Sequence, residues 1–135
     1  MPLIQWNNEL SVGIASIDEQ HKELINIINA LNDALEKGQT SQTLAEIFDG
    51  LAAYTVKHFG YEEALFALHG YSESQAHKNE HSALINQVQV LRQKMLDGDF
   101  IVSIEVMTFL KEWLTHHILI TDKAYSQFLV DKGVV

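Results

Sequence analysis

The sequence predicts an all-α protein: an up-down-up-down antiparallel four-helix bundle with an irregular N-terminal arm. Apolar residues recur at spacings of three and four in four stretches of the chain, which is the period of one face of an α-helix. Short polar or glycine-containing segments separate these stretches, so consecutive helices must run antiparallel. No alternating strand pattern competes with this interpretation.

The arm covers about residues 1–17 and has apolar residues without helical phasing, among them Trp6, which we expect to anchor the arm by packing. The first helix is predicted over about 18–37, with Gly38 as its C-terminal cap. Its apolar face is formed by Leu24, Ile25, Ile28, Leu31 and Leu35. The second helix should start after a cap at Thr40 or Ser41 and run toward Gly70.

Ser72 with Gln75 three residues later has the pattern of a capping box, which predicts the start of the third helix. This helix should end at Gly98. The fourth helix is expected from near Ser103 to about Leu129. The prediction is therefore one domain over 1–135, with the bundle over about 18–131.

Composition narrows the classes of function. The net charge is -9 with only 9 basic residues, which disfavours nucleic acid and anionic membranes as partners. No apolar run is long enough for membrane insertion, and the first residues lack the pattern of a secretion signal, so a cytoplasmic location is expected. The chain has no cysteine, so any metal must be held by nitrogen and oxygen atoms.

Histidines and carboxylates recur in the helical stretches. In HFGYEE, His58 and Glu62 are four residues apart and share one helix face, which alone is typical of a surface pair. His77 and His81 repeat this spacing. At a rise of about 1.5 Å per residue, the sets from all four helices fall toward the same end of the bundle. They are His21; His58 and Glu62; His77 and His81; His117 and Asp122.

This convergence predicts a buried metal site. The set contains seven protein ligands, too many for one tetrahedral zinc ion, so two metal ions are expected. With two carboxylates and a solvent-derived oxygen as bridges, a metal with three histidines is six-coordinate. A metal with two histidines keeps one vacancy, where a small ligand could bind.

The segment around His117 and Asp122 has an unusual spacing. Five residues separate the two, and a regular α-helix would leave their side chains about 140° apart. His116 does not remove the problem, because it would be about 120° off on the other side. A π-bulge absorbs one residue and would make the spacing behave like four. We therefore predict a π-bulge over 117–122, with His117 as the ligand and His116 turned away.

The chain resembles the bacterial hemerythrins. The matching segments cover nearly all of it: the tryptophan-bearing arm with IDEQHKELI, then HFGYEE, HKNEH and WLTHHILITD. The resemblance implies a four-helix bundle that binds dioxygen reversibly at two iron ions bridged by Glu62, Asp122 and an oxo or hydroxo group. It also implies that His77, His81 and His117 hold the closed iron, and that His21 and His58 hold the open one.

Several apolar residues beside the ligands could form a dry ligand pocket, although they fit core packing equally well: Leu24, Phe59, Trp113, Leu114 and Ile118. Thr115 departs from the apolar residue of many relatives and could donate a hydrogen bond to the bound ligand. The expected function is oxygen transport, storage or delivery to an oxygen-consuming enzyme, without enzymatic activity of its own. The alternatives are a sensor of oxygen or nitric oxide acting through a separate partner, and a di-iron peroxidase or oxidase.

Overall fold

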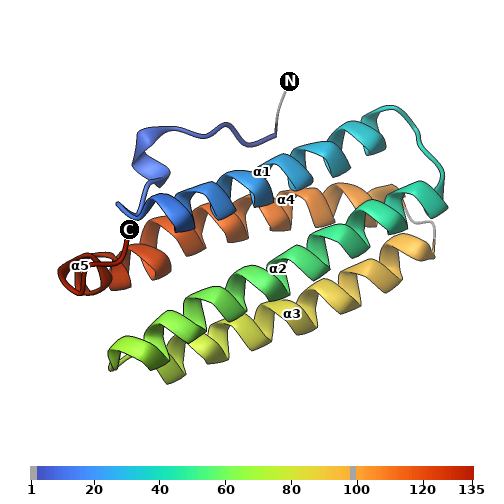
Figure 1. Cartoon of the computed structure of the whole chain (residues 1–135). Helices are drawn as coiled ribbons and strands as arrows, with labels where there is room; N and C mark the ends of the chain where they lie inside the picture. Colours follow the sequence, from blue (N-terminus) through green and yellow to red (C-terminus); the bar gives the residue numbers. More distant parts are fainter. Residues whose placement is uncertain (1–2, 98–99) are drawn as a thin grey trace.

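The computed structural model describes residues 3–97 and 100–135 and contains four long helices packed side by side (Figure 1). They are α1 (Ala15–Glu36), α2 (Ser41–His69), α3 (Ser74–Leu96) and α4 (Phe100–His116). Figure 1 shows consecutive helices running in opposite directions, and no β-strand occurs in the described part of the chain. The predicted antiparallel four-helix bundle is confirmed.

The helix starts show which polar side chains act as caps. The hydroxyl of Thr40 accepts a hydrogen bond from the Thr43 amide at the start of α2, as predicted. Helix α1 begins three residues before Asp18, because the Asp18 carboxylate binds the arm instead of capping the helix. Helix α3 begins at Ser74 rather than Ser72. The side-chain amide of Gln75 donates to the side chain of Asn79 instead of completing a capping box.

The helix ends are set largely by the backbone. Gly70 has a φ of 71°, a left-handed conformation that favours glycine and ends α2. Helix α3 ends at Leu96, while Gly98, the predicted end, lies outside the described residues. Helix α4 is already formed at Phe100, ahead of the predicted start at Ser103.

The predicted fourth helix is divided into three parts. After α4 the chain forms a π-helix, η2 (His117–Asp122), and then α5 (Lys123–Asp131). In Figure 1, α4 runs across the view whereas α5 is seen nearly end-on, so the chain changes direction at η2. The π-helix therefore lies at the bend of the chain.

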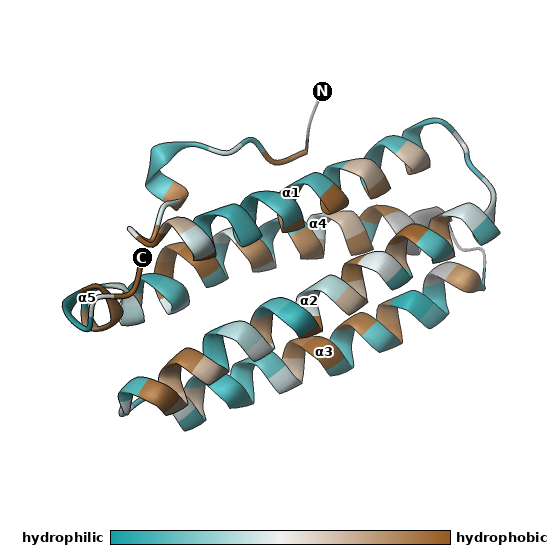
Figure 2. Ribbon diagram, viewed as in Figure 1, coloured by the Kyte–Doolittle hydropathy of each residue, from teal (hydrophilic) through white to brown (hydrophobic). Residues whose placement is uncertain are grey.

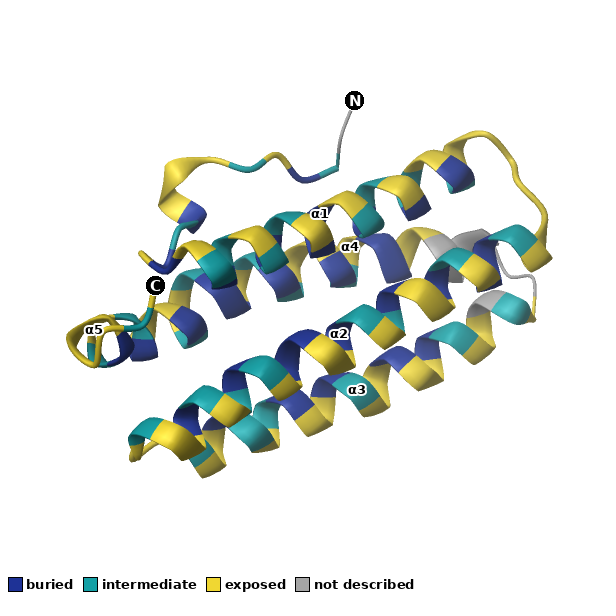
Figure 3. Ribbon diagram, viewed as in Figure 1, coloured by how far each residue is buried: buried dark blue, intermediate teal, exposed yellow. Residues whose placement is uncertain are grey.

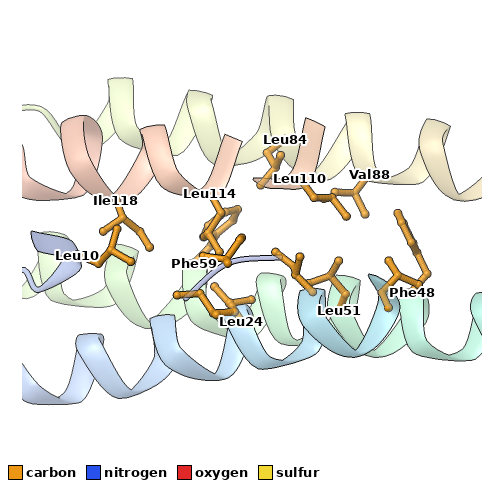
Figure 4. Packing of buried hydrophobic residues seen from close by; sticks show 14 of the residues in the cluster. Leu10, Leu24, Phe48, Leu51, Phe59, Leu84, Val88, Leu110, Leu114 and Ile118 are labelled. Atoms are coloured by element: carbon orange, nitrogen blue, oxygen red, sulfur yellow. The ribbon is translucent and has the colours of Figure 1, made fainter. Parts of the chain in front are cut away.

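The core lies between the four helices. Buried faces of the helices point inward in Figure 3, and brown apolar residues in Figure 2 occupy much of the same surface. Leucine, isoleucine and phenylalanine side chains from all four helices meet along the bundle axis (Figure 4). Burial of each such side chain stabilises the fold by roughly 1.5–3 kcal/mol. Toward one end this apolar core gives way to buried histidines and carboxylates.

The N-terminal arm, residues 3–14, includes a short 3-10 helix, η1 (Asn8–Leu10), and lies along α1 (Figure 1). Asn29 pairs with both backbone groups of Ile4, accepting from its amide at 2.9 Å and donating to its carbonyl at 2.8 Å. The Val12 amide donates to Asp18, and the Ser126 hydroxyl of α5 donates to the Val12 carbonyl. The contacts of Ile4 hold the start of the arm along α1, and those of Val12 hold its end beside the start of α1 and beside α5.

Candidate metal centre

Seven buried histidine and carboxylate side chains converge from four segments of the chain. Each is at most 4 % exposed. Helix α1 supplies His21, α2 supplies His58 and Glu62, α3 supplies His77 and His81, and η2 supplies His117 and Asp122. The structure thus brings together all seven residues that the sequence singled out as metal ligands.

The seven side chains form two overlapping groups. One group contains Glu62, His77, His81, His117 and Asp122; the other contains His21, His58, Glu62 and Asp122. Within each group, one potential ligand atom per residue lies within 4.8 Å of all the others. Both carboxylates belong to both groups, whereas three histidines belong to the first group and two to the second.

The inward-facing atoms are close to one another. Asp122 contacts three histidines: its Oδ1 lies 2.9 Å from His117 Nε2 and 3.2 Å from His77 Nε2, and its Oδ2 lies 3.0 Å from His21 Nε2. Glu62 Oε1 lies 2.8 Å from His58 Nε2. Yet all five Nε2 atoms and all four carboxylate oxygens lack a partner with hydrogen-bond geometry among the described residues.

Buried polar atoms without hydrogen bonds destabilise a protein, each by about 1–3 kcal/mol and more when charged. Nine such atoms in one cluster are therefore expected to bind something that satisfies them all. Imidazole nitrogens with carboxylate oxygens suit iron, manganese or zinc, and the number of donors exceeds what one tetrahedral ion takes. The donor set fits a pair of iron ions.

The π-helix explains how His117 and Asp122 reach the same place. The Lys123 amide donates to the Ile118 carbonyl, an i to i+5 hydrogen bond. This wider turn brings the Asp122 carboxylate to 2.9 Å from His117 Nε2. The predicted π-bulge is confirmed, and His116 is exposed while His117 is 1 % exposed.

Adjacent histidines on this segment allow a matched test. His117→Ala should lower the iron content, because it removes one nitrogen donor from the buried cluster. His116→Ala should keep the iron content unchanged, because its side chain is exposed. Metal analysis of the two purified variants measures the difference, and iron loss in His116→Ala with normal content in His117→Ala would reverse the assignment.

Three histidines are oriented through their other ring nitrogen. His58 Nδ1 lies 2.6 Å from Gln20 Oε1, His81 Nδ1 lies 3.3 Å from Glu63 Oε2, and His117 Nδ1 lies 3.0 Å from Glu80 Oε1. Such partners fix the ring orientation of a ligating histidine. Consecutive helical residues point about 100° apart, so the sequence predicts only a surface or supporting role for Glu63 beside Glu62, and it indicates no role for Gln20 and Glu80. The available signal was that Gln20 and Glu80 immediately precede His21 and His81.

A small cavity of about 10 Å³ lies about one helical turn from the cluster, because Leu24, Thr55, Leu84 and Leu114 line it and are each three residues from a histidine of the cluster. Leu24, Trp113 and Leu114, which the sequence analysis named beside the ligands, are among its lining residues. Figure 4 shows Leu24 and Leu114 pointing into this region from opposite sides. The remaining lining residues are Ile28, Leu51, Val88 and Leu110.

The other suggested pocket residues have different surroundings. The ring of Phe59 stacks on His81 with centroids 3.6 Å apart, and Ile118 is fully buried in the core. Thr115 is half-buried, and its hydroxyl donates to the Lys111 carbonyl at 2.6 Å, so it is directed at its own helix rather than at the cavity. The hydroxyl that does lie at the cavity belongs to Thr55, and it donates to the Leu51 carbonyl.

The cluster shifts the pKa values of its own members in the metal-free protein. Burial, together with the neighbouring His77 and His117, lowers the pKa of His81 to about 2. Burial also opposes protonation of His117, but Asp122, Glu62 and Glu80 outweigh this effect and raise its pKa to about 9. Burial alone would raise the pKa of Asp122, whereas contact with His117 holds it well below its usual range.

These shifts predict that the metal-free protein is most stable near pH 6.5. Between pH 6.5 and about 2, unfolding allows His81 to take up a proton, so stability falls as the pH falls. Between pH 6.5 and about 9, unfolding releases the proton of His117, so stability falls as the pH rises. On each side of pH 6.5, the free energy of unfolding should change by up to about 1.4 kcal/mol per pH unit.

Urea unfolding of the metal-free protein across this pH range measures the free energy of unfolding on both sides of pH 6.5. Above pH 6.5 this free energy should depend less on pH in His117→Asn, because asparagine does not titrate. If the pH dependence above pH 6.5 is unchanged in that variant, another group holds the proton.

Comparison with known proteins gives a consistent picture. Residues 12–129 match the family profile described as the hemerythrin HHE cation binding domain. The chain is 37 % identical to the bacteriohemerythrin of Pseudomonas paraeruginosa over 125 residues, which cover 93 % of this chain and 80 % of that protein. It is 32 % identical to the bacteriohemerythrin of Methylococcus capsulatus over 130 residues, which cover 96 % and 98 % of the two chains.

Solved structures agree with the sequence matches. A crystal structure of wild-type hemerythrin superimposes with a TM-score of 0.82 at 30 % identity and covers 94 % of this chain and 98 % of its own. A hemerythrin structure with a single substitution has a TM-score of 0.84 at 29 % identity, with 96 % and 98 % coverage. The resemblance read from the sequence motifs is confirmed.

Proposed function

Because the chain belongs to the hemerythrin family, whose members bind dioxygen at a di-iron site and are not enzymes, we propose that it binds dioxygen reversibly for transport, storage or delivery to an oxygen-consuming enzyme. The observation that supports this proposal most strongly is the division of the cluster into two groups that share both carboxylates. A single-ion site would not require two overlapping sets of donors.

In this proposal, Glu62 and Asp122 would serve both irons, because both carboxylates belong to both groups of potential ligands. His77, His81 and His117 hold one iron, and His21 and His58 hold the other. The pair of irons supplies the electrons and the open coordination position needed to bind dioxygen. The two-histidine group offers one donor fewer, so dioxygen would bind on that side.

The surroundings of the site support reversible binding. The nearby cavity is lined by aliphatic and aromatic side chains, together with the Thr55 hydroxyl, which is already bonded to a backbone carbonyl. A hydroxyl that is already donating is a weak source of protons. Few groups in this cavity could therefore hydrate or protonate a bound ligand, and this favours its release as dioxygen.

The direct test combines iron analysis with stopped-flow absorption spectroscopy under repeated oxygen cycles. The purified protein should contain two irons per chain and should oxygenate and deoxygenate through many cycles with the same amplitude. Irreversible oxidation in the first cycle, or one metal ion per chain, would contradict the proposal.

A further inference from the structure

The hydrogen-bond partners of the histidine rings differ between the two proposed iron positions. On the three-histidine side, His81 and His117 each face a carboxylate, from Glu63 and Glu80. On the two-histidine side, His58 faces the neutral side-chain amide of Gln20. Nδ1 of His21 is buried and has no hydrogen-bond partner among the described residues. Among the described residues, carboxylates therefore bind the outer ring nitrogens only of histidines on the three-histidine side.

Glu80 is held firmly although its side chain is 39 % exposed. Thr121 Oγ1 donates to it, 3.0 Å from Oε1 and 3.3 Å from Oε2. Thr121 belongs to η2, so the same π-helix that carries His117 also carries the group that orients its partner. Glu63 is 30 % exposed, and its Oε2 lies 3.3 Å from His81 Nδ1. Both carboxylates thus approach a buried ring from the solvent side of the cluster.

A carboxylate that accepts the Nδ1–H of an imidazole increases the electron density at Nε2 and makes the ring a more basic ligand. It also adds a negative charge close to the metal, which favours the higher charge of a ferric ion over a ferrous one. An amide oxygen orients the ring without adding a net charge. The two positions should therefore differ in how easily their iron is oxidised.

We propose that Glu63 and Glu80 are positioning residues that make the three-histidine iron the first of the pair to be oxidised, while the neutral Gln20 keeps the two-histidine iron ferrous for longer. This inference rests on the proposed di-iron function and adds a control of its redox behaviour. Its consequence is that the iron with the open position resists loss of an electron when no oxygen is bound. A one-electron oxidation should therefore give a mixed-valence pair with the ferric iron on the three-histidine side.

Isosteric substitutions test this inference in the iron-loaded protein. Glu80→Gln and Glu63→Gln should raise the potential of the first one-electron oxidation. Gln20→Glu should lower the potential of the second. Each change should alter the ratio of oxidised to reduced iron at a fixed poise by about tenfold, which corresponds to about 59 mV for a one-electron couple. Both kinds of substitution should narrow the gap between the two steps, from opposite sides.

Glu73→Gln is the matched control, because Glu73 and Glu80 line the same surface groove and the substitution removes the same charge. Glu80→Asp, which keeps the charge, should restore most of the wild-type potential. Equal potentials in Glu80→Gln and Glu73→Gln, or shifts of the same step by Glu80→Gln and Gln20→Glu, would overturn the inference.

Iron content separates this inference from the proposed function. If the wild-type protein does not bind two irons per chain, both the proposed function and this inference are refuted. A wild-type protein with two irons and reversible oxygen binding, but with unshifted potentials in the variants, refutes the inference alone. If Glu80→Gln does not keep its iron, Glu63→Gln and Gln20→Glu carry the same test from α2 and α1.

Discussion

Replacing Glu62 with alanine should remove both irons and abolish oxygen binding. Glu62 belongs to both groups of potential ligands, and its two oxygens face His58 on one side and His77 on the other. Loss of this carboxylate leaves neither group complete. Since loss of a supporting partner alone typically lowers metal affinity 10–100-fold, loss of a shared ligand should lower it by roughly a hundredfold or more at both positions.

Metal analysis of the purified variant measures this effect. Glu46→Ala is a suitable control, because Glu46 is an exposed carboxylate on the same helix and accepts a hydrogen bond from Gln42. Two irons and normal oxygen binding in Glu62→Ala would show that Glu62 is not a bridge. A contrasting result is expected for His58→Ala, which should affect the two-histidine position first.

Deletion of Ile120 should leave the iron site intact, whereas deletion of Glu112 should destroy it. The π-helix contains one residue more than an α-helix of the same rise, so removing Ile120 should convert η2 into regular α-helix without rotating α5. Ile120 is 62 % exposed, and its side chain leaves no cavity in the core. In α4, removal of one residue instead rotates everything after it by about 100° and turns His117 out of the cluster.

Iron content and far-ultraviolet circular dichroism of the two deletion variants provide the comparison. Both deletions remove one exposed residue, so a general loss of stability would affect them alike. If the Ile120 deletion variant is folded but has lost its iron, the site needs the π-helix for more than the direction in which Asp122 points. Retention of iron in the Glu112 deletion would mean that the loops can absorb the rotation.

The sequence alone was sufficient to predict the bundle and the convergence of the seven side chains. Helical periodicity and short loops determine the height of each residue along the bundle, and height was enough to place the histidines at one end. The π-helix could also be predicted, because the five-residue spacing of His117 and Asp122 conflicts with a regular helix. These are all properties of single helices or of their order.

Features that depend on how helices rotate against one another were harder to predict. Gln20 and Glu80 reach His58 and His117 on other elements, at sequence separations of 38 and 37 residues. The hydroxyl of Thr115 donates to the Lys111 carbonyl one turn earlier, and α1 starts earlier than predicted because the carboxylate of Asp18 binds the arm. Polar side chains have several partners within reach, and the tertiary packing decides among them.

The contacts of Val12 join the two ends of the chain into one cooperative unit. Its amide is bound by Asp18 of α1 and its carbonyl by Ser126 of α5. Gly13, with a φ of 75°, turns the chain beside Ser126 and Val130. Detachment of the arm would therefore release α5, which follows directly after Asp122. In hydrogen–deuterium exchange, the amides of Val12 and of α5 should therefore exchange at the same rate, although the two segments are far apart in the sequence. Bound iron should slow the exchange of both.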